Sequence, residues 1–197
     1  MIKLGITGGM GSGKSTVSEI FFLCGIPVYI ADAESKRLTA ESPVIREKLI
    51  RIYGEKLFEG GVLNKALLAS FIFNDRNRLE QVNAIIHPEV EKDFREWAVS
   101  HKHYPVVAHE AAILFESGFD TLMDKMIMVY APLETRLERT IKRDGVTREK
   151  VLERIQNQMP DEEKARLSDF VIVNDGTRSL IEQVLDILKQ IGESQQQ

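Results

Sequence analysis

The chain has 197 residues, of which 43% are hydrophobic, and its 26 basic and 30 acidic side chains give a net charge of −4 at pH 7. This length suits a single domain over residues 1–197, and the apolar content excludes a disordered chain. The mildly acidic balance argues against a protein that its overall charge holds to nucleic acid. The single cysteine, Cys24, excludes a disulfide framework and multi-cysteine metal sites. Because Cys24 follows the apolar run Phe21–Leu23, we expect a buried thiol.

The start of the chain lacks the basic-then-apolar pattern of a secretion signal and runs directly into the apolar segment Ile2–Thr7. The longest uncharged run, Ile20–Ala31, is shorter than a membrane span and is interrupted by Gly25 and Pro27. We therefore expect a cytoplasmic protein that needs no membrane, no nucleic acid and no obligatory protein partner.

Short apolar segments alternate along the chain with longer segments of helical period. The first helix is expected over Lys14–Leu23, where Gly25 stops it. The strands lack strict polar alternation, which is typical of a sheet that is covered on both faces. Strands separated by helices predict right-handed crossovers and a parallel α/β sheet. The predicted strands are Ile2–Thr7, Ile26–Ala31, Pro105–Ala108, Met126–Ala131 and Phe170–Val173.

Two later stretches also have helical period. From residue 62, apolar residues recur at three- and four-residue intervals with no strand-like run, so we assign residues 60–100 to a helical insertion. The stretch Leu133–Met159 is rich in arginine and lysine, has a hinge or turn at Asp144-Gly145 and should end at Pro160. Its basic residues form either a solvated helix face or a surface that faces an anionic substrate. Among them, Arg136 and Arg139 could serve only to solubilise the helix.

Residues Gly8–Ser15 match the pattern G-x-x-x-x-G-K-[ST] without a deviation, between the first predicted strand and the first predicted helix. The glycines let the loop curl so that backbone N–H groups point at phosphate oxygens, and the start of the helix favours the same anion. Lys14 adds a positive charge for the β- and γ-phosphates, and the Ser15 hydroxyl can complete a Mg²⁺ shell. The alternative is a glycine-rich turn that merely opens a helix. We predict that a nucleoside triphosphate with Mg²⁺ is bound by Gly9, Gly11, Ser12, Gly13, Lys14, Ser15 and Thr16.

A phosphate cradle alone does not separate GTPases, motor ATPases and small-molecule kinases. The Asn-Lys-x-Asp segment that reads guanine is missing, and neither Val106–Glu110 nor Met126–Ala131 ends in the adjacent acidic residues of motor domains. Asp32 is the first acid at the end of a predicted strand, where side chains face the ligand crevice of a parallel sheet. Asp32 can therefore accept the proton of an attacking hydroxyl. It can also cap the helix that follows, and both roles are compatible.

With these residues in view, the sequence resembles the dephospho-coenzyme A kinase family over nearly its whole length. The cradle is common to many kinases, whereas the ordered set that includes His87-Pro88 and Ile113–Glu116 is specific to this family. The segments that carry the resemblance are Gly5–Val17, Gly25-Ile26, Ala31-Asp32, Gly61–Leu63 with Phe73, Ile86–Pro88, Ile113–Glu116, Arg154–Gln158 and Ser168–Gly176.

The resemblance implies an α/β fold of the P-loop NTPase type, a parallel sheet flanked by helices, with a helical substrate-binding insertion at residues 60–100 and a mobile lid at residues 133–160. It implies that ATP, with Mg²⁺, phosphorylates the ribose 3′-hydroxyl of dephospho-coenzyme A, the last step of coenzyme A synthesis. It assigns Lys14 and Ser15 to ATP and Mg²⁺, and Asp32 to the role of general base.

Further roles are implied in the same way. Arg143 falls in the lid that closes on the phosphates and joins the catalytic set, and Asn174 lies where the family passes the adenine. Thr7 and His87 are assigned, with the general base, to the acceptor substrate. His87 could equally just precede a helix that has Pro88 at its first position.

Three positions depart from the family pattern: Ile30 replaces an earlier acid of the second strand, Lys36 replaces an arginine, and Ala112 replaces a proline. Two other functions stay open, namely a kinase for a nucleoside monophosphate or a sugar, and a non-catalytic nucleotide-binding regulator. The loop setting and variable spacing of three histidines favour solvated side chains over a metal site; these are His101, His103 and His109.

Overall fold

The computed structural model describes residues 1–72 and 75–194, so Phe73 and Gln195–Gln197 lie outside the described residues. Its internal contacts divide the chain into two units. The first consists of Met1–Tyr29 and His101–Gln197, and the second of Ile30–Ser100. The second unit contains the predicted insertion at residues 60–100 and begins upstream of it.

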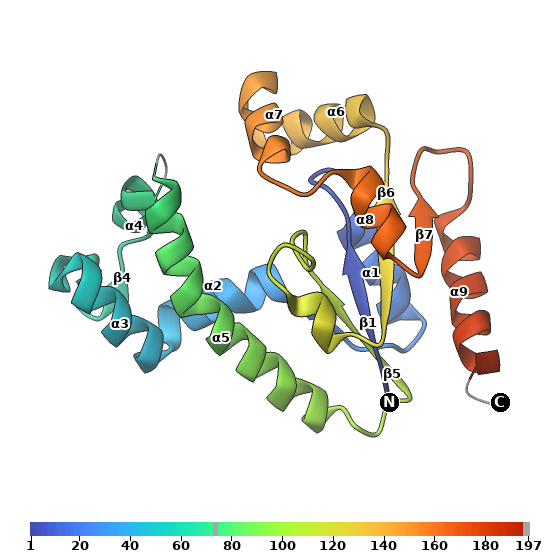
Figure 1. Cartoon of the computed structure of the whole chain (residues 1–197), viewed down its shortest axis with the longest axis horizontal. Helices are drawn as coiled ribbons and strands as arrows, with labels where there is room; N and C mark the ends of the chain where they lie inside the picture. The colour runs from blue at the N-terminus through green and yellow to red at the C-terminus, as the bar shows by residue number, and fades with distance from the viewer. Residues whose placement is uncertain (73–74, 195–197) are drawn as a thin grey trace. The chain divides into compact units, whose positions relative to one another are not determined.

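The first unit is built on a five-stranded sheet with the strand order β2-β5-β1-β6-β7 (Figure 1). Strand β1 pairs in parallel with β5 and β6, and β6 pairs in parallel with β7. The predicted parallel α/β sheet is therefore confirmed, and each strand lies within two residues of its expected ends. The strands are β1 (Ile2–Thr7), β2 (Val28–Ile30), β5 (Val106–Glu110), β6 (Lys125–Tyr130) and β7 (Phe170–Val173).

The basic stretch after β6 forms two helices, which meet at the hinge or turn predicted at Asp144-Gly145. The chain reverses at Gly145, which has a left-handed φ of 65° and ends the first of them. Pro160 precedes the next helix instead of ending a long one. Helices α6 and α7 pack against each other. The helices of this unit are α1 (Lys14–Leu23), η2 (Phe119–Leu122), α6 (Leu133–Asp144), α7 (Arg148–Gln156), α8 (Asp161–Leu167) and α9 (Leu180–Ser194).

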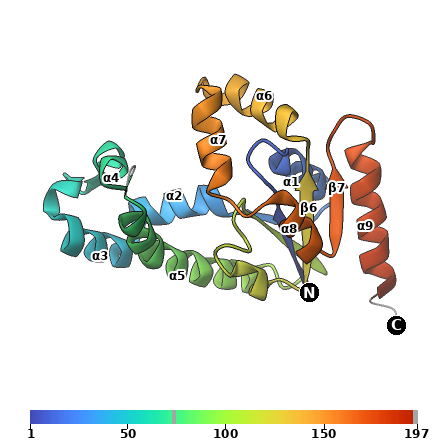
Figure 2. The same ribbon diagram turned by 45° about the horizontal axis from the view of Figure 1, so that its top comes forward.

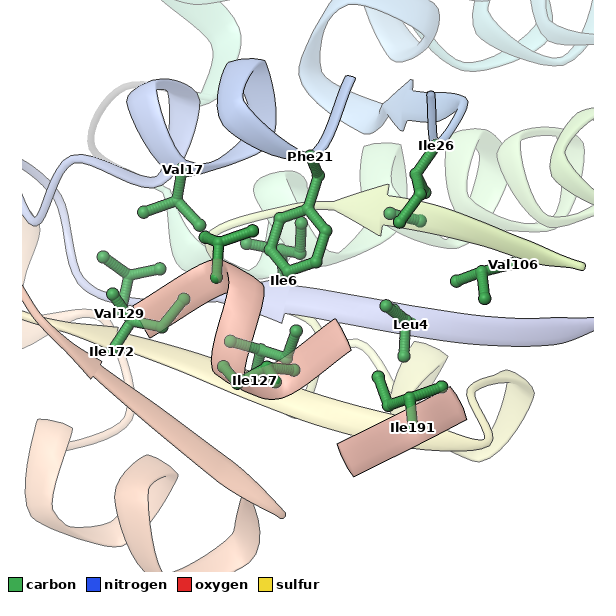
Figure 3. Close-up of a cluster of buried hydrophobic side chains, with 13 residues drawn as sticks. Leu4, Ile6, Val17, Phe21, Ile26, Val106, Ile127, Val129, Ile172 and Ile191 are labelled. Carbon is green, nitrogen blue, oxygen red and sulfur yellow. The ribbon is translucent and has the colours of Figure 1, made fainter. Parts of the chain in front are cut away.

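Helices α1 and α9 cover one face of the sheet, and the main hydrophobic core lies beneath them (Figure 3). Successive side chains of a strand point to opposite faces of the sheet, so Leu4 and Ile6 of β1 share one face. Both point into this core and are fully buried. Val17 and Phe21 lie one helical turn apart on α1 and meet them from above. Burying one such side chain stabilises the fold by about 1.5–3 kcal/mol. This core holds β1 against α1 and so fixes both ends of the loop that joins them.

The expectation of a buried Cys24 is wrong, because its thiol is exposed. A helix buries only the stripe that faces the core, and on α1 that stripe carries Phe21. Phe22 and Leu23 are 65% and 76% exposed, so the apolar run continues onto the solvent side of the helix end.

The second unit is mainly helical (Figure 2). The predicted helical period from residue 62 is found in α4 and α5, but a short two-stranded hairpin precedes them because Gly60 and Gly61 adopt positive φ values. No helix of the described residues in either unit is long and apolar enough to cross a membrane. The elements of this unit are α2 (Ala31–Glu41), α3 (Pro43–Tyr53), η1 (Glu55–Leu57), β3 (Phe58–Glu59), β4 (Val62–Leu63), α4 (Lys65–Ile72) and α5 (Arg76–Ser100).

The expectation of a solvated His109 is also wrong. His109 belongs to β5, on the sheet face opposite the α1–α9 core, and is only 1% exposed. Its ring stacks on Tyr29 at a centroid distance of 5.2 Å and also contacts Phe119. Burial disfavours the charged imidazolium and lowers the pKa of His109 to about 4.

We predict that His109 makes the fold sensitive to acid. The unfolded chain takes up this proton near pH 6.5, whereas the folded chain does so only near pH 4, so stability is complete above pH 6.5 and is lost as the pH falls toward 4. At 1.36 kcal/mol per pKa unit the loss amounts to about 3 kcal/mol. In urea unfolding, the free energy of unfolding of His109→Phe should fall by about 3 kcal/mol less than that of the unsubstituted chain as the pH is lowered from 6.5 to 4. Parallel pH profiles for the two proteins would contradict the prediction.

Candidate functional site

The Gly8–Ser15 motif forms the connection between β1 and α1. The loop closes tightly, with the Ser12 N–H donating to the Gly9 carbonyl at 3.1 Å. Gly13 adopts a left-handed conformation, with φ 95° and ψ 24°, immediately before the first residue of α1. A residue with a Cβ is strained in that conformation, so this turn into the helix requires glycine.

A cavity of about 280 Å³ lies over the second half of this loop. Its walls come from the loop, from the start of α1 and from α6. The Lys14 ammonium donates to the Gly9 carbonyl at 3.4 Å, across the turn of the loop. The structure thus brings most of the predicted phosphate-binding residues together with Arg143. The cavity is lined by Gly11, Gly13, Lys14, Ser15, Thr16, Arg139, Thr140 and Arg143.

The basic residues of the cavity are Lys14, Arg139 and Arg143. The Nη1 atom of Arg139 is buried and has no hydrogen-bond partner among the described residues. Arg143 donates from Nε to Asp144 at 2.7 Å, and this bond raises the pKa of Arg143 and lowers the pKa of Asp144. A buried guanidinium nitrogen without an acceptor is costly, and an anionic ligand would supply the missing acceptor. The position of Arg139 therefore favours binding of a ligand over the alternative that this side chain only solubilises the helix.

Asn174 connects the end of β7 to the loop. Its Nδ2 donates to the Ser12 carbonyl at 2.8 Å, and its Oδ1 accepts from Arg139 at 3.4 Å. The side chain approaches so closely that a Cβ on Gly13 would collide with Nδ2. These bonds hold the loop in place, while contact of Asn174 with a nucleotide stays a prediction.

Like Asn174, three further predicted residues of the first unit lie outside the cavity lining. Thr7 is fully buried and donates to the Ala112 carbonyl at 3.4 Å. Ser12 is fully buried as well, and its hydroxyl finds no partner among the described residues. Gly9 lies against the guanidinium of Arg136, where a Cβ would collide with that group. Their assigned contacts with ligands stay predictions.

Arg136 does not solubilise α6, because it is only 4% exposed. Its Nε donates to the Met10 carbonyl at 2.9 Å, and its Nη1 forms an ion pair with Asp161. Arg136 therefore supports the loop from behind, while Arg139 and Arg143 of the same helix line the cavity.

Asp32 and His87 belong to the second unit. Asp32 is exposed in the first turn of α2, and Ile30 occupies the N-cap position, so the alternative that Asp32 caps the helix is wrong. His87 lies inside α5, which continues through Pro88, so it does not merely precede a helix. Burial lowers the pKa of His87.

The second unit has a cavity of its own, of about 410 Å³. Its floor is apolar and comes mainly from α4 and α5, with Ser35, Lys36 and Thr39 contributed by α2. A cavity of this size with few polar groups is typical of a small-molecule site. The apolar lining consists of Leu63, Leu68, Ala69, Ile72, Leu79, Val82 and Ile86, and Lys65 and Asn83 complete it.

Comparison with known proteins decides the family. The model of the Dephospho-CoA kinase family matches residues 2–179. A Dephospho-CoA kinase of Bacteroides fragilis is 49% identical over 187 residues, covering 95% of this chain and 91% of that protein. The chain belongs to the dephospho-CoA kinase family. The crystal structure of TT1252 from Thermus thermophilus superposes with a TM-score of 0.84 at 36% identity and 96% coverage of both chains.

More distant kinases share the fold alone. A shikimate kinase from Acinetobacter baumannii superposes with a TM-score of 0.54 at 15% identity, covering 98% of this chain and 94% of that one. This likeness confirms the predicted P-loop type of sheet.

Some residues of this dephospho-CoA kinase family member escaped the sequence interpretation. Lys164 is completely buried, donates to the Ala112 carbonyl at 2.6 Å and pairs with Glu116 at 2.8 Å. It thereby fixes the segment in which Ala112 replaces the family's proline. Glu110 is buried at the end of β5, opposite Ile6 of β1. Its signal was present, since an acid directly after an apolar strand marks the ligand edge of a parallel sheet.

We predict that Gly13→Ala damages the cradle more than Gly25→Ala damages its turn. Both glycines have positive φ, so both variants should lose about 1–2 kcal/mol of unfolding free energy through backbone strain. Nothing lies within 4 Å of a Cβ at Gly25, whereas a Cβ at Gly13 displaces Asn174. Calorimetry should therefore show at least about tenfold weaker ADP binding for Gly13→Ala only. Equal ADP affinity in the two variants would show that Asn174 tolerates the displacement.

Proposed function

We propose that this chain transfers the γ-phosphoryl group of ATP to the ribose 3′-hydroxyl of dephospho-CoA, which gives CoA and ADP in the last step of CoA biosynthesis. Membership of the dephospho-CoA kinase family supports this reaction. The observation that carries it is the convergence, in one cavity, of the glycine-rich loop, Lys14 and a buried guanidinium nitrogen of Arg139 that lacks an acceptor. A triphosphate has the charge and the oxygen acceptors that this cavity requires.

The ATP side of the reaction rests on charge. Phosphoryl transfer needs the developing negative charge to be neutralised, and Lys14, Arg139 and Arg143 supply positive charge around one cavity. The exposed Ser15 hydroxyl at the start of α1 offers the hard oxygen ligand that Mg²⁺ prefers. Glu110, buried at the end of the neighbouring strand β5, is a carboxylate that could support that ion. When bound, Mg²⁺ neutralises charge on the phosphates.

The acceptor side requires a base. Asp32 is exposed and follows directly after β2, a strand of the sheet that carries the cradle. In the proposed step the 3′-oxygen forms a bond to the γ-phosphorus, and the bond from this phosphorus to the bridging oxygen of ADP breaks. The hydroxyl proton passes to the Asp32 carboxylate. Helices α6 and α7, on either side of Gly145, are the proposed lid over residues 133–160, and its closure would exclude water that could hydrolyse ATP.

The second unit is the proposed acceptor-binding part. Dephospho-CoA is an adenosine diphosphate that carries a long arm with methyl groups and two amides. The 410 Å³ cavity fits such an arm, because its floor is apolar while Ser35, Thr39 and Asn83 offer hydrogen bonds. Lys36 and Lys65 add positive charge to the same lining. His87 lies one residue beyond Ile86 of this lining, and its contact with the acceptor stays a prediction.

We predict that Asp32→Asn lowers kcat by about 10²–10⁴ and changes both KM values little, because the amide keeps the shape but cannot take the proton. A coupled assay of ADP release measures this with dephospho-CoA, a nucleoside monophosphate, a sugar and no acceptor. Normal turnover of Asp32→Asn would remove Asp32 from the role of base. Release of ADP with another acceptor only would reassign the substrate, and ATP binding without acceptor-dependent release would indicate a nucleotide-binding regulator.

We predict that Ala69→Leu blocks the arm of the acceptor. Ala69 is an exposed residue of the cavity lining on α4, and a larger side chain there fills the cavity without disturbing the core. The kcat/KM for dephospho-CoA should fall about tenfold, as for a loss of roughly 1–3 kcal/mol of apolar contact. The kcat/KM for AMP, which has the same ribose hydroxyl and no arm, should not change. Ala66→Leu on the same helix, outside the cavity lining, is the matched control, and equal effects of both variants would contradict the assignment.

A further inference from the structure

The peptide groups on either side of Met10 are held from both directions. The Met10 N–H donates to the side-chain oxygen of Gln158 at 3.0 Å, and the Met10 carbonyl accepts from Arg136 at 2.9 Å. Met10 lies in the first half of the loop and is not part of the cavity lining, which begins at Gly11. These bonds therefore fix the loop immediately before the residues that face the cavity.

The Arg136 side of this clamp is buried. The side chains of Arg136 and Asp161 are only 5% and 9% exposed, and they form an ion pair directly against Gly9. Burial raises the pKa of Asp161, against the opposing effects of Arg136 and Lys14. A buried pair of this kind contributes little net stability but fixes geometry, because either charge left alone is costly.

The Gln158 side connects the loop to the segment between α7 and α8. The next residue, Met159, donates its N–H to Glu116 at 2.8 Å, and Glu116 pairs with the buried Lys164 of α8. Gln158 therefore lies next to a residue that is bonded to Glu116, and its carboxamide reaches the loop without being part of the cavity lining.

We propose that Gln158 and Arg136 are positioning residues for the nucleotide phosphates, which act by clamping Met10 and so aligning the backbone N–H groups that follow it. A backbone amide donates well only within a narrow range of angles, and a loop rich in glycine has few side chains of its own to fix them. The clamp supplies that restraint from α6 and from the α7–α8 connection. The inference rests on the proposed function for the identity of the ligand, and it concerns residues to which that function assigns no role.

The test replaces Gln158 in the full chain. Gln158→Met keeps the length of the side chain and removes the acceptor, whereas Gln158→Glu keeps an oxygen acceptor. Loss of one such hydrogen bond is worth about 0.5–1.5 kcal/mol, or roughly twofold to tenfold. Amide exchange of Met10 in the ligand-free protein should therefore accelerate by about that factor in Gln158→Met and stay slow in Gln158→Glu. Gln156→Met, an exposed position two residues earlier, is the matched control for exchange.

The binding measurements separate positioning from stability. For Gln158→Met, the Kd for ADP and the KM for ATP should rise by about the same factor, with an unchanged KM for dephospho-CoA and a Tm that falls only by the few degrees that one hydrogen bond is worth. The proposal is overturned by unchanged Met10 exchange and ADP affinity, by equal effects of Gln156→Met on exchange, or by a joint rise of both KM values with a fall in Tm larger than one hydrogen bond explains. Because exchange and ADP binding require no turnover, an inactive but ADP-binding wild-type chain would sink the proposed function and leave this inference supported.

Discussion

Backbone amides can hold an anion only while the loop that carries them is prevented from satisfying them internally. A glycine-rich loop has many conformations in which its own carbonyls would accept those N–H groups, so the surrounding structure has to select one. In this protein the Ser12 N–H and Lys14 both donate to the Gly9 carbonyl within the loop, and further restraints come from outside it. Asn174 donates to the Ser12 carbonyl, and Arg136 donates to the Met10 carbonyl. Carbonyls that accept from side chains are less available to the loop's own N–H groups.

The same restraint explains where the basic residues of α6 lie. Positions 136, 139 and 143 recur at three- and four-residue intervals, so they follow one side of the helix, yet their surroundings differ. Arg136 lies behind the loop in a buried ion pair, Arg139 is half-buried in the cavity, and Arg143 reaches Asp144 near the helix end. A gradient from structural support to charge that lines the cavity therefore runs along a single helix. The basic residues of α6 therefore cannot all be assigned the single role of keeping the helix soluble.

Sequence patterns over a few neighbouring residues predicted those parts of the fold that depend only on neighbouring residues. The bounds of β1, α1 and β7 follow from apolar period and glycine punctuation, and they match the structure. The cradle was predictable for the same reason, because phosphate binding requires these residue types at this spacing within one short segment. The turn at Asp144-Gly145 was predicted from its glycine, and the structure confirms it. Glu110 also had a local signal, but the sequence did not show that this side chain is buried.

Other features depend on partners far apart in the sequence and could not be predicted from local patterns. Burial of Arg136 requires Asp161 and the Met10 carbonyl, and burial of Lys164 requires the Ala112 carbonyl and Glu116. Seen in the sequence alone, both are ordinary basic residues on charged helices. A cation becomes structural only when the fold places an acceptor beside it that water cannot reach. In this chain the acceptors of Arg136 lie against the loop Gly8–Ser15, so a residue that the sequence could not assign helps to hold the most predictable motif in shape.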